Sequence, residues 1–157
     1  MKFVFLAIGK TSEEYLKEGI TIYDKRLKNY ITLETKIIPD IKKTSGLSMA
    51  DQQNKEGKLL LDQVLPGNLL VLLDEHGKEM NSVDFANFLQ KYMLMSIKSM
   101  IFAVGGPYGF SKEVHDRANE VISLSKMTFS HQMVRLIFFE QLYRAMTILK
   151  NEPYHHQ

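Results

Sequence analysis

The sequence contains no cysteine among its 157 residues. This absence excludes disulfide bonds, thiolate zinc sites and cysteine nucleophiles, and it fits a protein of a reducing compartment. Long apolar stretches are absent as well. The run at residues 3–8 is too short for the core of a signal peptide, and nothing reaches the ~18 apolar residues of a transmembrane helix. We therefore expect a cytoplasmic protein without a membrane-spanning segment.

Common nucleotide and metal motifs are also missing. Neither G-x-G-x-x-G nor G-x-x-x-x-G-K-[ST] occurs, so a dinucleotide or P-loop site loses most of its support. The histidines show no H-E-x-x-H or other ligand spacing, and we expect no metal site. They are His76, His115, His131, His155 and His156. The net charge of +2 is too small to argue for or against a nucleic acid partner.

Segments typical of strands alternate with segments typical of helices along the whole chain. The expected strands are residues 2–9, 31–39, 69–77 and 100–104, and residues 121–129 are expected to form a fifth strand or an extended segment. Helices are expected over residues 49–64 and 131–150, and after the capping residues Thr11 or Ser12, Ser82 and Ser111. This pattern predicts a single α/β domain, residues 1–157, with a mostly parallel sheet and helices on both faces.

The last helix is apolar around nearly its whole circumference. Such a helix is normally buried on all sides, yet a domain of this size has little room to enclose one. The pattern favours a helix that packs on the sheet with one side and on a second subunit with another. A helix central to its own domain is the alternative. The apolar residues are Met133, Val134, Leu136, Ile137, Phe138, Phe139, Leu142, Tyr143, Ala145, Met146, Ile148 and Leu149.

A glycine-rich segment, GGPYG at residues 105–109, follows the expected strand at 100–104. In open α/β sheets, ligands bind beyond the carboxyl ends of the strands. Glycines let backbone N–H groups come close to a ligand, and Pro107 limits the freedom of the loop. The composition alone leaves a ligand-binding loop and an ordinary turn both open.

Other polar candidates occupy a strand end and the last helix. Asp74 ends the third expected strand, where a carboxylate suits a ribose or an ammonium group as well as a solvated turn. Arg135 and Arg144 stand on the apolar last helix, and a buried arginine needs a partner such as Glu140 or a phosphate. Residue type alone leaves these alternatives open.

Several segments occur together in one order, and together they carry a resemblance. They are FLAIGK, YDKRL, KEG at residues 55–57, LLDEHGK, VGGPYGFS, ISLSKMTFSHQMVRL, EQLYRA and the terminal PYHH. Each segment is weak alone, but the ordered set runs from residue 3 to residue 156 and is specific. The chain resembles the RlmH family of small SPOUT-class (α/β-knot) methyltransferases, which methylate N3 of a pseudouridine in 23S ribosomal RNA.

The resemblance implies an α/β fold with a trefoil knot at its carboxyl end, a homodimer, and S-adenosylmethionine as the methyl donor. It places the donor among three loops, and the cofactor-binding residues carried over are Leu73, Gly106, Ser125, Lys126, Met127, Thr128, Phe129 and Ser130. Family members tend to have a proline before the histidine of the third loop. This sequence has Ser130 there, which predicts a less rigid loop.

Methyl transfer to this nitrogen requires the loss of a proton, so catalytic side chains are expected as well. Tyr154 and His155 in the tail are candidates for removing the proton or contacting the base, from across a dimer. Arg144 is a candidate for neutralising the negative charge that develops, and His131 is a further candidate for the proton. Phosphate contacts are expected from residues that are equally typical of a solvated surface, namely Lys25, Arg26, Lys28, Lys42 and Lys43.

The resemblance implies that the substrate is 23S rRNA within the assembled ribosome rather than naked RNA. Two other interpretations stay open. One is a SPOUT methyltransferase that acts on another RNA, such as tRNA. The other is a non-catalytic ribosome-binding factor on the same scaffold, which predicts no affinity for the donor.

Overall fold

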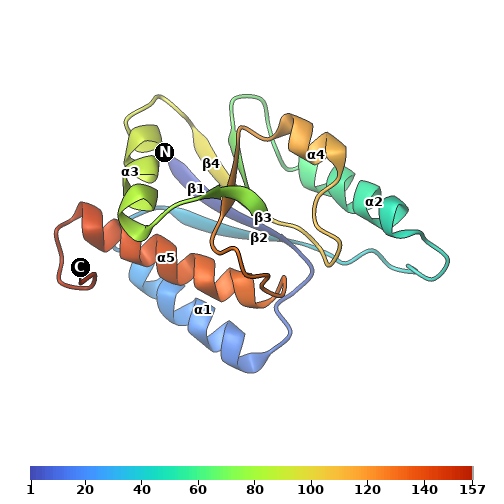
Figure 1. The fold of residues 1–157 in the computed structure, drawn as a ribbon, viewed down its shortest axis with the longest axis horizontal. Coiled ribbons are helices and arrows are strands. Elements are labelled where there is room, and N and C mark those ends of the chain that lie inside the picture. The colour runs from blue at the N-terminus through green and yellow to red at the C-terminus, as the bar shows by residue number, and fades with distance from the viewer. Residues whose placement is uncertain (157) are drawn as a thin grey trace.

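The computed structural model describes residues 1–156, so Gln157 lies outside the described residues. Its strands are all parallel and form one sheet in the order β2-β1-β4-β3-β5 (Figure 1). They are β1 (Lys2–Ile8), β2 (Leu33–Ile38), β3 (Leu69–Glu79), β4 (Ser99–Val104) and β5 (Glu120–Ser123). The helices are α1 (Glu14–Leu27), α2 (Met49–Leu61), α3 (Ser82–Met93), α4 (Lys112–Arg117) and α5 (Met133–Leu149). The predicted α/β class and parallel sheet are confirmed.

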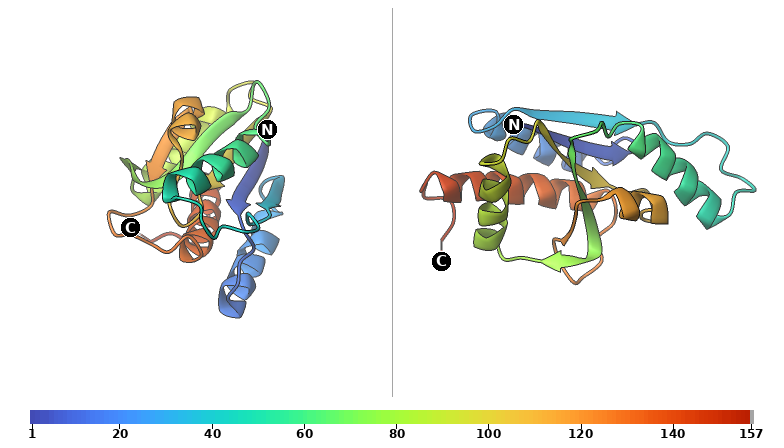
Figure 2. Two further views of the ribbon diagram at one scale, coloured as in Figure 1. Left: turned by 90° about the vertical axis from the view of Figure 1, so that its right-hand side faces the viewer. Right: turned by 90° about the horizontal axis from the view of Figure 1, so that it is seen from above.

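Helices cover both faces of the sheet, as the sequence predicts (Figures 1 and 2). Helix α5 packs against both α1 and α3 on one face, and α2 packs against α4 on the other. Strand β1 supplies side chains to both cores in alternation, with Phe3, Phe5 and Ala7 on the α5 side and Val4, Leu6 and Ile8 on the α2 side. Because both faces are buried, the strand is a continuous apolar run in the sequence.

The helix starts differ in part from the predicted caps. Ser111 caps α4 as expected, since its Oγ accepts from the N–H of Val114 at 3.4 Å. The expected cap Ser82 is wrong by one residue: Asn81 caps α3 through the N–H of Asp84. Asparagine and serine are comparable caps, so residue type alone did not indicate which of the neighbours Asn81 and Ser82 would cap the helix.

The cap expected for α1, at Thr11 or Ser12, is wrong. Helix α1 follows Glu13, which makes no side-chain capping bond. Thr11 instead accepts a hydrogen bond from Arg135, and the Ser12 N–H donates to Gln132. Gln132 and Arg135, just before and within the first turn of α5, thus hold Ser12 and Thr11. Local sequence does not reveal such a tertiary contact.

The expected strand at residues 121–129 is much shorter in the structure. Strand β5 ends at Ser123, and residues 124–132, which we call the β5–α5 segment, leave the sheet. Strand β3 extends to Glu79, and its pairing with β5 shifts register between Leu73 and Lys78. Residues 74–77 of β3 are left out of this ladder, and Ser123, the last residue of β5, pairs with Glu79, so the β5–α5 segment leaves the sheet beside the far end of β3.

Helix α5 is only partly buried within one chain. Phe138, Phe139, Leu142, Ala145 and Met146 are buried against the sheet and its neighbouring helices. Other apolar side chains stay half-buried: Met133, Val134, Leu136, Ile137, Tyr143, Ile148 and Leu149. Four of these, Val134, Tyr143, Ile148 and Leu149, pack against the same core, so the second apolar side that the sequence indicates is only partly exposed within one chain. Within residues 1–156, no helix combines the length and the apolarity that crossing a bilayer requires.

An aromatic cluster joins α5 to the centre of the sheet. Phe138 is fully buried, and its ring centroid lies 5.5 Å from that of Phe5 on β1 and 4.8 Å from that of Phe102 on β4. Phe139 meets Phe5 edge-on at 5.0 Å. Aromatic pairs in this range add to the stabilisation from burial itself, so this cluster fixes where α5 lies on the sheet.

We expect Phe138→Ala to lower the free energy of unfolding by about 4 kcal/mol, because it removes a buried ring and leaves a cavity between two strands and a helix. Urea denaturation followed by circular dichroism measures the loss. Leu94→Ala is the control, because Leu94 is 83% exposed, and it should change the value by no more than ~0.5 kcal/mol. Equal losses for the two variants would contradict this description of the core.

Candidate functional site

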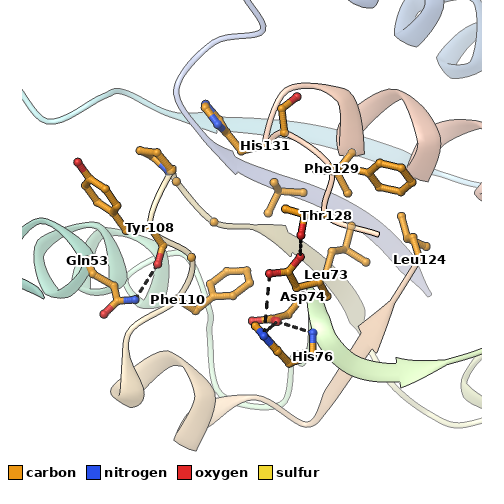
Figure 3. A pocket seen from close by; sticks show the side chains of 18 of the residues that line it. Gln53, Leu73, Asp74, His76, Tyr108, Phe110, Leu124, Thr128, Phe129 and His131 are labelled. Atoms are coloured by element: carbon orange, nitrogen blue, oxygen red, sulfur yellow. Dashed lines mark hydrogen bonds and ion pairs between the residues drawn. The ribbon is translucent and has the colours of Figure 1, made fainter. Parts of the chain in front are cut away.

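A pocket of about 660 Å³ opens beyond the carboxyl ends of β3, β4 and β5 (Figure 3). Three segments surround it: residues 73–76 after the buried part of β3, residues 104–110 after β4, and the β5–α5 segment. Met49 and Gln53 of α2, His115 of α4 and Val134 of α5 complete the lining. Because all strands are parallel, the segments that leave β3, β4 and β5 emerge at the same edge of the sheet, which brings them together.

The glycine-rich segment makes a tight turn at the pocket. The N–H of Gly109 donates to the carbonyl of Gly106 at 3.1 Å, and Gly109 has a φ of +74°, which favours glycine. A Cβ at Gly106 would lie 2.3 Å from Oε2 of Glu56, so a side chain there would require the Glu56 carboxylate to move. Gln53 donates to the carbonyl of Tyr108 at 2.9 Å (Figure 3). The turn is therefore held from α2, and its backbone borders the pocket.

A polar rim follows the end of β3. Oδ1 of Asp74 accepts from the backbone N–H of His76 at 2.9 Å and lies 3.0 Å from its Nδ1 (Figure 3). Its other oxygen lies 3.5 Å from Nε2 of His115. The Asp74 side chain is mostly buried, with 13% exposed. A largely desolvated carboxylate thus faces a pocket whose deeper lining, with Leu73, is apolar.

The β5–α5 segment is held by its own small polar side chains. The Oγ of Ser125 accepts from the N–H of Met127 at 2.9 Å, and Thr128 donates to Glu75 of the rim. Ser130, which stands where a proline was expected, accepts from the N–H of Met133 at 3.1 Å through its hydroxyl. These bonds order the segment and start α5, so Ser130 restricts the loop by hydrogen bonding where a proline ring would restrict it covalently.

Arg135 ties this segment to the first strand. Its side chain is fully buried and donates to the carbonyls of Ile8 and Gly9, each at 2.8 Å, and to that of His131 at 3.0 Å. Burial lowers the pKa of Arg135 below its ordinary value, but an arginine stays charged near neutrality. The choice between Glu140 and a phosphate, left open above, is thus settled for Arg135: its partners are backbone oxygens and the hydroxyl of Thr11.

His131 lines the pocket beside this arginine. Burial, and then the charge of Arg135, lower the pKa of His131 below its ordinary value, and Asp40 partly opposes the shift. The imidazole is therefore neutral at neutral pH and is able to accept a hydrogen bond or a proton from a group in the pocket.

Most of the predicted donor-binding residues come together here. Those that line the pocket are Leu73, Gly106, Ser125, Met127, Thr128, Phe129 and Ser130. Lys126 is the exception, because it is not part of the lining and its side chain extends toward Glu79, 3.7 Å away. The sequence analysis missed the contribution of α2, although Glu56 stands four residues before the buried Leu60 and so on the inner side of that helix.

The predicted catalytic residues lie along the second half of α5 and in the tail that folds back onto it (Figure 1). Arg144 follows Val134, the residue of α5 that lines the pocket, by ten positions, about 15 Å along the helix at 1.5 Å per residue. Arg144, Tyr154 and His155 are not part of the pocket lining of their own chain. Within the described residues, no group of histidine and carboxylate side chains is arranged to hold a metal ion.

These three residues form a cluster around Glu140. Arg144 donates to Oε1 of Glu140 at 2.5 Å, and the Tyr154 hydroxyl donates to the same oxygen at 3.0 Å. The Arg144 guanidinium lies 4.7 Å from the centroid of the Tyr154 ring, and its Nη1 is 3.4 Å from Nδ1 of His155. Burial and hydrogen bonds to Tyr23 and Glu140 raise the pKa of Tyr154. The phenol therefore stays protonated at neutral pH.

We expect Arg135→Met to lower the free energy of unfolding by about 3 kcal/mol, because it leaves several buried carbonyls without a donor. Arg117→Met is the control: Arg117 is half-buried near the surface and donates to the carbonyl of Asn68, and its loss should cost about 1 kcal/mol or less. Thermal and urea denaturation measure both variants. A loss no larger for Arg135 than for Arg117 would contradict the structural role given to Arg135.

Comparison with known proteins identifies the family of this chain. The family described as "Predicted SPOUT methyltransferase" matches residues 1–155. Proteins named ribosomal RNA large subunit methyltransferase H are similar over the full length of both chains, at 57% identity in Parabacteroides distasonis, 55% in Christiangramia forsetii and 54% in Phocaeicola vulgatus.

Solved structures are similar in fold at low sequence identity. A probable methyltransferase from Bordetella pertussis has a TM-score of 0.58 at 9% identity, covering 92% of this chain and 94% of its own. A probable methylase family protein from Haemophilus influenzae has a TM-score of 0.54 at 10% identity, covering 99% and 70%. The full-length match of sequence and the agreement in fold lead to one conclusion: this chain belongs to the SPOUT methyltransferase family.

Proposed function

We propose that this protein transfers a methyl group from S-adenosylmethionine to N3 of a pseudouridine in 23S rRNA, in the cytoplasm and on the assembled ribosome. The observation that carries the proposal is the convergence of three strand-end segments on one pocket, in a chain whose relatives are named rRNA large subunit methyltransferases. We propose that this reaction requires no metal ion.

The residues present fit such a donor. The volume of about 660 Å³ lies in the range of cofactor sites, and the lack of room for a Cβ at Gly106 leaves backbone at the pocket wall. The apolar lining, with Leu73, Val104 and Leu124, suits an adenine, and the carboxylate of Asp74 suits a ribose or an ammonium group. When bound, the sulfonium donor supplies an electrophilic methyl group. The protein's task is then to orient the acceptor nitrogen and to remove its proton.

Side chains of the tail cluster suit that task. An imidazole accepts a proton near neutrality, which favours His155 as the base. Tyr154, whose pKa is raised, serves better as a hydrogen-bond donor to the nucleobase. Arg144 lies within 3.4 Å of His155, where its positive charge would stabilise the nucleobase anion as the proton leaves.

A homodimer is part of the proposal. In one chain none of the three residues of the tail cluster lines the pocket, which supports a site completed by the tail of a second copy beside the pocket of the first. The half-buried apolar residues of α5, among them Ile137 and Leu136, suit such an interface. The basic residues Lys25 and Arg26 of α1, with Lys28, Lys42 and Lys43, would then add phosphate contacts.

A trefoil knot is part of the proposal as well. After β5, on the edge of the sheet beside β3, the chain passes the carboxyl ends of the strands and enters α5 on the opposite face from α4. The contacts of Gln132 and Arg135 with residues 8–12 mark this passage. Such a path supports a chain threaded through its own loop, an exception to the usual rule.

We expect the protein to bind S-adenosylmethionine, and Gly106→Val to abolish this binding because the new side chain would collide with the Glu56 carboxylate and displace the glycine-rich turn at the pocket. Isothermal titration calorimetry measures the affinity, and circular dichroism confirms that the variant is folded. Gly46→Val is the control, since a Cβ there meets nothing within 4 Å; despite the local strain at its φ of +87°, donor affinity should be kept. No binding by the unaltered protein would favour a non-catalytic ribosome-binding factor. Unchanged binding by Gly106→Val would place the donor elsewhere.

We expect complementation between two defective chains. Gly106→Val and a chain truncated after Pro153 should each be inactive on ribosomes as homodimers. A heterodimer isolated with two different tags combines one intact pocket with one intact tail, and should recover about half of the unaltered activity per dimer, since one of two equivalent sites is restored. An inactive heterodimer would contradict a site shared between subunits, and full activity of the truncated homodimer would exclude the tail from catalysis.

A further inference from the structure

One face of α2 contacts the glycine loop, residues 105–111, at three successive points. Gln53 donates to the carbonyl of Tyr108 at 2.9 Å. Oε2 of Glu56 would lie 2.3 Å from a Cβ at Gly106, and a Cβ at Gly57 would lie 2.4 Å from Oγ of Ser111. The helical positions 53, 56 and 57 are neighbours on one face, so α2 supports the loop along its whole length.

Glu56 is the unexpected member of this face. It is 4% exposed, although a glutamate is seldom buried without a charged partner. Its Oε1 accepts from Nε2 of Gln52 at 3.1 Å, and its Oε2, on the side of Gly106, is buried without a hydrogen-bond partner. An ionised oxygen in that position is far more costly than a neutral carboxyl group.

The net effect of the groups around Glu56 is to raise its pKa. Burial raises the pKa of Glu56 above its ordinary value, the hydrogen bond from Gln52 partly opposes the shift, and the nearby carboxylate of Asp40 adds to it. These groups come from α2 itself and from the segment after β2, and the glycine loop on the remaining side offers Gly106, which has no side chain. The surroundings of Glu56 therefore favour its neutral form.

We propose that Glu56 is a positioning residue: in its neutral form it packs against Gly106 and holds the glycine loop in the shape that receives the donor. Ionisation would place an unpaired negative charge behind the loop, and water would have to reach it by displacing the loop. This inference rests on the proposed function for the identity of the donor. The contact between α2 and the loop does not depend on it.

The first test needs no ligand. Amide hydrogen exchange over residues 105–110 should be faster in Glu56→Ala than in the unaltered protein, because the loop loses its support. Glu56→Gln, which keeps the shape without the charge, should exchange as slowly as the unaltered protein. Asp51→Ala, at an exposed carboxylate on the same helix, is the control. Unchanged exchange in Glu56→Ala would overturn the proposal.

The second test measures donor affinity as a function of pH, with S-adenosylmethionine as the probe. Affinity of the unaltered protein should fall as the pH rises through the raised pKa of Glu56, whereas Glu56→Gln should keep the low-pH affinity throughout. Glu56→Ala should bind roughly tenfold more weakly at every pH, a change that corresponds to ~1.4 kcal/mol. If Glu56→Gln binds as weakly as Glu56→Ala at every pH, the ionised carboxylate is the working form and the proposal is wrong.

A double-mutant cycle tests the contact with Gly106 directly. The stability lost on Gly106→Ala should be smaller in a Glu56→Ala background, because the smaller side chain leaves space for the new methyl group. Additive losses would contradict the contact. If the unaltered protein binds no S-adenosylmethionine at all, the proposed function fails, while hydrogen exchange and this cycle still decide the role of Glu56.

Discussion

The structure depends on the buried guanidinium of Arg135, which joins the end of the first strand to the start of the last helix. Its bonds to the carbonyls of Ile8, Gly9 and His131 fix the β5–α5 segment at the edge of the sheet. That segment is one wall of the pocket, and the strand end that Arg135 holds is part of the same edge. A single side chain thus links the core, the course of the chain and the geometry of the site.

The parallel sheet explains why the other two walls lie where they do. Strands β3 and β4 pair in register up to Leu73 and Val104, so the segments that follow them emerge side by side. The register shift of β3 against β5 leaves residues 74–77 out of the ladder, and Asp74, Glu75 and His76 among them line the pocket. Helix α2 lies on the face of the sheet opposite α5. Its residues Gln53 and Glu56 contact the glycine loop and so support this wall of the pocket.

The sequence was most informative where local chemistry decides the structure. The apolar strands, the cap at Ser111 and the strand-end position of GGPYG follow from residue type and spacing. The start of α1 did not follow, because Thr11 and Ser12 bond to residues more than a hundred positions away. The role of Arg135 and the burial of Glu56 were hidden for the same reason, since both arise from contacts between distant segments.

The remote position of the tail cluster is informative in itself. Tyr154, His155 and Arg144 are ordered around Glu140, yet none of them lines the pocket that would hold the donor. A protein that methylates a nucleobase needs both parts at one acceptor atom. We therefore propose that the tail of one chain completes the pocket of another.

The central claim is methyl transfer from the pocket to ribosomal RNA, and isotopic labelling tests it most directly. Purified protein would be incubated with ribosomes that lack the modification and with S-adenosylmethionine carrying a deuterated methyl group. Nuclease digestion and mass spectrometry of the RNA then locate the label. The account predicts one labelled nucleotide, a pseudouridine of 23S rRNA methylated at N3. Label in another RNA, or no label in RNA at all, would contradict it.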